Sequence, residues 1–87
     1  MLRITATETG NHQITLQLEG RIAGPWVTEL WKACEKIFGE EQSLVLNLAE
    51  VSFLDPAGVT LLTKFRSRGV ELADCSPFVR EQLKTAG

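Results

Sequence analysis

The chain has 87 residues, which is enough for one domain and too few for two. Apolar residues make up 44% and charged residues 23%, which argues against disorder, and the net charge of −2 is spread without the basic stripe of nucleic-acid binders. No apolar run is long enough for a membrane span or a leader, so we expect a single cytoplasmic domain over residues 1–87 with no direct membrane insertion.

The chain begins with a predicted β-hairpin. Apolar and polar residues alternate over residues 2–6 and again over 14–18, as in strands with one buried face. Residues 9–12, Thr-Gly-Asn-His, separate the two segments with a turn signal. His12, the only histidine, falls in this turn, and we expect it to be exposed and without a functional role.

Residues 25–38 have the periodicity of an amphipathic helix, with Pro25 suited to its first turn and Gly39 to its end. The predicted apolar stripe consists of Val27, Leu30, Trp31, Cys34, Ile37 and Phe38. Trp31 and Cys34 are therefore predicted to be core residues. Two interpretations of Trp26 remain open, either as a hydrophobic staple at the start of the helix or as part of an exposed contact patch.

A nearly continuous apolar run over residues 44–48 predicts a central strand, and the shorter segment 51–54 follows it. The helical period returns after Pro56 and ends at Gly69. Its predicted inward residues are Val59, Leu62 and Phe65.

Residues 70–73 predict another short strand. Ser76 is a suitable N-cap for a third helix that Pro77 opens. The predicted apolar side of that helix consists of Phe78, Val79 and Leu83. The element order is therefore β-β-α-β-α-β-α. This order predicts an α/β domain with a mixed sheet of about four strands, in which right-handed crossovers join the later, parallel strands.

The residues needed for most catalytic or metal sites are missing. One histidine and the widely separated Cys34 and Cys75 make no zinc set, and no P-loop, dinucleotide-binding or nucleophile-elbow motif is present. We therefore expect no enzymatic activity, no metal and no cofactor. Both cysteines are predicted to be reduced and at least half-buried thiols. A disulfide between them remains open, although a cytoplasmic location argues against it.

The turn Asp55-Pro56-Ala57-Gly58 is the most informative segment. Asp55 is well placed as an N-cap, Pro56 suits the first helical position, and Gly58 permits a close approach to the backbone. The segment thus predicts a helix that starts abruptly after a buried strand, where ligands and partners often dock on α/β sheets. A well-capped helix with no further role is the alternative.

The segment 44–59, LVLNLAEVSFLDPAGV, resembles the signature of STAS domains, the anti-sigma-factor antagonist family, with Asn47 in place of the usual aspartate. The segment 16–22, LQLEGRI, is similar to the second strand of that family. The resemblance extends from about Leu2 to Leu83. It implies a STAS-like fold and a non-enzymatic domain that docks to a regulatory protein such as an anti-sigma-factor kinase.

In the family, the second serine of a "DSSG" turn is phosphorylated, and the phosphate blocks docking. The two serine positions are occupied here by Pro56 and Ala57, neither of which can carry a phosphate. Three interpretations follow from this difference. Binding is constitutive, or control passes to Ser52, Thr60 or Thr63, or the domain is an accessory subunit of a lipid-transport ATPase complex. A nucleotide- or lipid-binding STAS module is a further alternative.

We predict a partner-binding surface at the start of the second helix and in the loop that precedes the first helix. Its residues are Asp55, Pro56, Ala57, Gly58, Thr60, Arg21 and Gly24. Many STAS domains continue with a further strand and helix beyond the third helix. An exposed sheet edge is therefore expected here, and it could support a homodimer.

Overall fold

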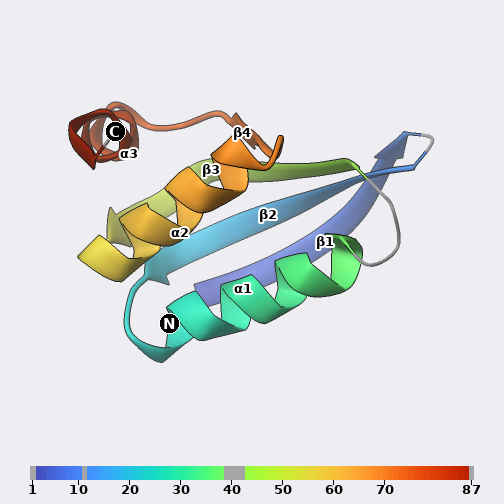
Figure 1. Cartoon of the computed structure of the whole chain (residues 1–87), viewed down its shortest axis with the longest axis horizontal. Helices are drawn as coiled ribbons and strands as arrows, with labels where there is room; N and C mark the ends of the chain where they lie inside the picture. The colour runs from blue at the N-terminus through green and yellow to red at the C-terminus, as the bar shows by residue number, and fades with distance from the viewer. Residues whose placement is uncertain (1, 11, 39–42, 87) are drawn as a thin grey trace.

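The computed structural model describes residues 2–10, 12–38 and 43–86, and its elements follow the predicted order (Figure 1). The elements are β1 (Leu2–Gly10), β2 (Gln13–Ile22), α1 (Pro25–Phe38), β3 (Ser43–Leu54), α2 (Pro56–Ser67), β4 (Glu71–Ala73) and α3 (Pro77–Ala86). The predicted α/β class is confirmed. The expected helix stop at Gly39 lies outside the described residues.

The four strands form one mixed sheet in the order β1-β2-β3-β4. β1 and β2 are antiparallel, as predicted for the hairpin, whereas β2 with β3 and β3 with β4 are parallel. His12 has a φ of 59° and is exposed in the turn between β1 and β2. Strands that follow one another in the sequence are thus also neighbours in the sheet.

β3 is one long strand, although two separate apolar segments predict it. Its pairing with β2 shifts twice, because β3 has one extra residue between Asn47 and Glu50 and another between Val51 and Phe53. Such bulges keep a strand paired while they turn it and change which side chains face inward. The interruption of the apolar pattern at Ala49-Glu50 therefore marks a bulge and not the end of the strand.

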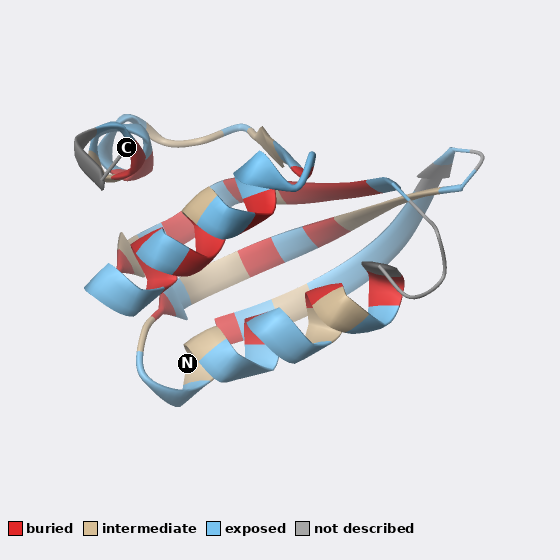
Figure 2. Ribbon diagram, in the orientation of Figure 1, coloured by how far each residue is buried: buried red, intermediate tan, exposed pale blue. Residues whose placement is uncertain are grey.

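Helices α1 and α2 lie against one face of the sheet (Figure 1). Leu16, Leu18, Leu46 and Leu48 point from the strands into the same core as residues from both helices. Figure 2 shows buried residues on the sheet and on the sides of α1 and α2 that face it. α3 packs beside α2, and the Gln82 side-chain amide on α3 donates to the Leu54 carbonyl oxygen at 3.0 Å.

The interpretation of Trp31 as a core residue is wrong, because 46% of its surface is exposed. Leu30, Cys34 and Ile37 define the buried stripe of α1. Trp31 lies about 100° around the helix from Leu30 and falls beyond the edge of that stripe. Trp26 is instead half-buried and packs against the core, which favours the staple interpretation.

Phe78 is likewise not part of the apolar side of α3, because 52% of its surface is exposed. Val79 and Leu83, four residues apart on one face of the helix, are buried as predicted. Ser76 Oγ accepts a hydrogen bond from the Val79 backbone N–H at 3.2 Å, which confirms the predicted N-cap.

Both cysteines are free thiols, as predicted; Cys34 is buried and Cys75 is half-buried. Burial raises the pKa of the Cys34 thiol to about 12, and the nearby Glu35 carboxylate adds to the effect. Cys34 is therefore a neutral packing residue at ordinary pH and not a nucleophile.

Candidate functional site

Asp55 lies between β3 and α2 and holds two loops together. Its Oδ1 accepts a hydrogen bond from the Gly58 backbone N–H at 2.7 Å, which confirms the predicted N-cap. Its Oδ2 accepts a hydrogen bond from the Gly24 backbone N–H at 2.9 Å, in the loop between β2 and α1. One carboxylate thus occupies the start of α2 and fixes the neighbouring loop against it.

Gly58 allows a close approach, but the approaching group belongs to the protein itself. A Cβ atom at Gly58 would lie 2.7 Å from the Ile22 carbonyl oxygen at the end of β2. The same carbonyl accepts a hydrogen bond from the Asp55 backbone N–H at 3.1 Å. Gly58 is buried, so it supports the candidate surface from beneath and does not form part of its exposed area.

Pro56, Ala57 and Thr60 lie exposed on the first two turns of α2. The Thr60 hydroxyl donates to the Pro56 carbonyl oxygen at 3.0 Å, so its side chain is held along the helix. Gly24, with a φ of 59°, is exposed in the loop beside them. The structure therefore brings together four of the predicted surface residues around the Asp55 carboxylate.

Arg21 does not join this group through its side chain. Ile22, the next residue along β2, points into the core, so Arg21 points to the opposite face of the sheet. There its guanidinium lies over the Phe53 ring, 5.0 Å from the ring centroid. Arg21 is thus connected to the candidate surface only through the backbone of β2, which continues into the loop beside α2.

A groove of about 210 Å³ runs between α1 and α2 and extends the exposed surface beyond the predicted residues. Ala57 and Thr60 line it from α2, and Trp31 lines it from α1. Val27 and Leu61 add apolar surface, and Lys64 contributes a positive charge. An exposed tryptophan beside a shallow, mainly apolar groove is typical of residues that carry binding energy in protein interfaces.

Sequence reasoning missed Trp31 and Lys64 as members of this surface. The sequence held one signal for Trp31. It directly follows Leu30, so its side chain points about 100° away from that of Leu30, whereas Cys34 and Ile37 share the side of Leu30. Lys64 follows Thr60 by one turn of α2, so it lies on the same side of that helix.

The three hydroxyls considered as substitute phosphorylation sites have different environments. Thr60 is exposed and borders the groove, whereas Thr63 is half-buried and donates to the Val59 carbonyl oxygen at 2.8 Å. Ser52 is exposed on β3 and donates to the Gly20 carbonyl oxygen at 3.2 Å. Thr60 is thus the hydroxyl that combines exposure with a position on the candidate surface.

The start of α2 offers little room for a further anion. Helix N-termini attract anions through unpaired N–H groups and the helix dipole. Here the Asp55 carboxylate already takes the Gly58 N–H, and the Asp55 carbonyl takes the Val59 N–H at 3.0 Å. The site is therefore suited to contact with another surface more than to the capture of a free phosphate.

In the described part of the chain, no three or more His, Cys, Asp and Glu side chains gather where they could ligate a metal ion. None of the helices within residues 2–10, 12–38 and 43–86 has the length and hydrophobicity that a bilayer span requires.

The fold resembles several solved structures. One is the crystal structure of Mglu, with a TM-score of 0.69 and 24% identity over 84% of this chain, which matches only 20% of the Mglu chain. Another is the anti-sigma factor antagonist SpoIIAA in its unphosphorylated form, with a TM-score of 0.71 and 21% identity over 94% of this chain and 82% of SpoIIAA.

The STAS domain of an antisigma-factor antagonist from Rhodobacter sphaeroides is also similar, with a TM-score of 0.63 and 20% identity over 87% of this chain and 92% of that one. No protein-family model matches the sequence, and no curated protein is similar to it. The comparisons establish a STAS-like fold, as the two sequence segments predicted.

Proposed function

We propose that this STAS-like domain is a non-catalytic protein-binding module of the cytoplasm. Its proposed docking surface is the exposed start of α2 together with the groove between α1 and α2. The observation that carries the proposal is that Ala57, which stands at the position of the family's phosphorylated serine, lines the same groove as the exposed Trp31. Tryptophan in such a position commonly supplies much of the energy of an interface.

The proposed partner is a regulatory protein such as an anti-sigma-factor kinase. Support comes from the likeness of the fold to SpoIIAA and to the Rhodobacter sphaeroides domain, both of which are described as anti-sigma-factor antagonists. The neutral methyl group of Ala57 is close in size and charge to an unphosphorylated serine. Docking at this surface is therefore proposed to be constitutive.

Catalysis is not part of this proposal. The only histidine lies exposed in the turn between β1 and β2, far along the strands from α2, and Cys34 is a buried neutral thiol. The candidate surface itself contributes a proline, an alanine, a threonine, a tryptophan and the single charge of Lys64, with Asp55 engaged in two hydrogen bonds. These groups suit contact between proteins.

Affinity capture tests the proposal and identifies the partner. The tagged domain and its Ala57→Glu variant are used as baits in an extract of the cells that produce the protein, and retained proteins are identified by mass spectrometry. We expect a regulatory kinase that the wild-type bait retains and the variant loses. Retention of a transport ATPase would instead assign the domain as an accessory subunit, and equal retention by both baits would contradict the proposed surface.

Incubation of the captured kinase and ATP with the domain tests constitutive docking separately. We expect no phosphate on the wild-type chain. Phosphate on Ser52, Thr60 or Thr63, mapped by mass spectrometry and accompanied by release of the partner, would overturn the constitutive interpretation while leaving the docking surface in place.

A further inference from the structure

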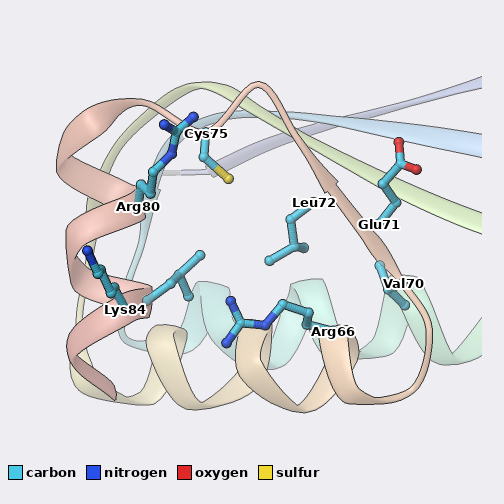
Figure 3. Close-up of a pocket in the computed structure, with 8 residues that line it drawn as sticks. Arg66, Val70, Glu71, Leu72, Cys75, Arg80 and Lys84 are labelled. Carbon is cyan, nitrogen blue, oxygen red and sulfur yellow. The ribbon is translucent and has the colours of Figure 1, made fainter. Parts of the chain in front are cut away.

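A second groove lies between α2, β4 and α3, on the side of α2 away from α1 (Figure 3). It has a volume of about 600 Å³. Val70, Leu72, Cys75 and Leu83 supply its apolar surface; Val70 and Leu83 are buried, whereas Leu72 and Cys75 are half-buried. An apolar group of a bound molecule could therefore be buried against these side chains.

Three cations border this groove. Arg66 reaches from α2 toward α3, and Arg80 and Lys84 stand on α3 across the groove (Figure 3). All three are exposed, and none of them forms a salt bridge with a residue that the structure describes. Among the described residues that line the groove, Glu71 is the only acidic one, and its carboxylate points away from the three cations in Figure 3. The groove is thus locally positive on a chain whose net charge is −2.

The groove adjoins an edge of the sheet. β4 pairs with β3 through Glu71, Leu72 and Ala73, and no other strand within the described residues lies along its opposite edge. An edge strand presents backbone N–H and C=O groups that another chain can pair with. Apolar surface, positive charge and unpaired backbone groups therefore occur together at one place.

We infer that this groove binds an extended acidic segment of a partner protein, which pairs with the free edge of β4. In this mode, backbone hydrogen bonds supply affinity and alternate side chains enter pockets. One apolar side chain of the segment would contact Leu72 and Leu83, while carboxylates two residues before and after it, on the same face of the strand, would face Arg66 and Arg80.

Other occupants fit the groove less well. A lipid carboxylate would match the cations and the apolar lining but would leave the backbone groups of the β4 edge unused. A single-stranded nucleic acid would match the cations, but none of the described lining residues is an aromatic one on which a base could stack. This groove is independent of the first docking surface, because α2 separates the two and Ala57 lines the groove facing α1 but not this one.

The test is an NMR titration of the ¹⁵N-labelled domain with a blocked heptapeptide of sequence Ser-Glu-Ser-Val-Ser-Glu-Ser, in which the valine and both glutamates lie on the same face of an extended chain. We expect chemical-shift changes at the amides of β4 and of the loop that follows it. The same heptapeptide with lysine in place of both glutamates serves as the charge control, and a version of the acidic peptide with methylated backbone nitrogens tests strand pairing. Each control peptide is expected to bind about tenfold or more weakly, because it loses either the charge match or the backbone hydrogen bonds.

A pair of charge-reversal variants locates the binding. Arg66→Glu with Arg80→Glu is expected to weaken binding of the acidic peptide by about tenfold or more, since two attractive contacts become repulsive. Lys32→Glu with Lys36→Glu makes the same change of net charge at exposed positions on α1 and is expected to leave the affinity within about twofold.

Three outcomes of the peptide experiments would overturn the inference. The first is the absence of shift changes at β4 up to millimolar peptide. The second is equal binding of the backbone-methylated peptide, and the third is an equal effect of the two charge-reversal pairs. Binding of oleate at the groove in place of the peptide, with the same sensitivity to Arg66→Glu and Arg80→Glu, would reassign the groove to a lipid anion and likewise overturn it.

Discussion

Asp55 and Gly24 are 31 positions apart in the chain and joined by a hydrogen bond of 2.9 Å from the Gly24 backbone N–H to Asp55 Oδ2. The other carboxylate oxygen of Asp55 caps α2 through Gly58. The loop before α1 and the start of α2 are therefore held as one unit, close in sequence to Val27 and Ala57, which line the groove between the two helices.

Replacement of Asp55 by alanine should destabilise the domain by about 2 kcal/mol, since the helix cap and the bond to Gly24 are both lost. Asp55→Asn keeps one acceptor oxygen and should cost about half as much. Urea unfolding followed by circular dichroism measures both variants. Equal stability of wild type and Asp55→Ala would show that the carboxylate does not hold the two loops.

A methyl group at position 58 should destabilise the fold even though Gly58 lies in a helix. Alanine in place of glycine usually stabilises a helix by about 0.5–1 kcal/mol. At this position the added Cβ would lie 2.7 Å from the Ile22 carbonyl oxygen. We therefore expect Gly58→Ala to lower the free energy of unfolding by about 1–3 kcal/mol. A rise in that free energy would contradict the close packing of α2 on β2.

The Cys34 thiol should make the stability of the domain depend on pH above its ordinary pKa. Burial raises the pKa in the folded state from 9.0 to about 12, so above pH 9 the unfolded chain loses its proton while the folded chain keeps it. The contribution of Cys34 is thus fully present below pH 9 and is lost as the pH rises toward 12.

Urea unfolding of wild type and Cys34→Ala at pH 8 and pH 10 isolates this contribution, since Cys75 is common to both. The wild type should lose about 1.4 kcal/mol more than the variant for each pH unit above the unfolded pKa. Iodoacetamide should also leave Cys34 unmodified in the native state at pH 8. Parallel pH profiles, or rapid modification of Cys34, would contradict its assignment as a buried neutral thiol.

Trp31 should matter for binding and not for stability. Trp31→Ala is expected to change the free energy of unfolding by less than about 1 kcal/mol, because the side chain is largely outside the core. It should weaken the affinity for the captured partner by about tenfold or more. Phe78→Ala removes another exposed aromatic side chain, on α3, and is the matched control. A partner that is equally sensitive to both variants, measured by calorimetry, would contradict the groove as the docking surface.

Much of the fold could be predicted because its signals are local. The alternation before and after the turn at residues 9–12 specifies the hairpin, and Pro25, Pro56 and Pro77 each begin a helix as expected. The cap residues Asp55 and Ser76 could be identified because N-capping depends on a residue and the three positions that follow it.

The rest depends on contacts between distant segments. The bulges of β3 follow from its pairing with β2, and the bond between Asp55 and Gly24 joins two loops that are adjacent only in the folded chain. Trp31 was predicted to be buried because a helical stripe has no sharp edge in the sequence, whereas the sheet covers only part of α1. The cations of the second groove come from α2 and α3, and their proximity follows from the packing of these helices.

The central claim is that the surface around Ala57 docks a protein. Its most direct test is an equilibrium titration of the purified captured partner with the wild type, Ala57→Glu and Thr5→Glu, of which the last carries the same added charge at an exposed position of β1. We predict that Ala57→Glu weakens the affinity by about tenfold or more while Thr5→Glu stays within about twofold of the wild type. An unchanged affinity for Ala57→Glu, with the fold intact by circular dichroism, would contradict the claim.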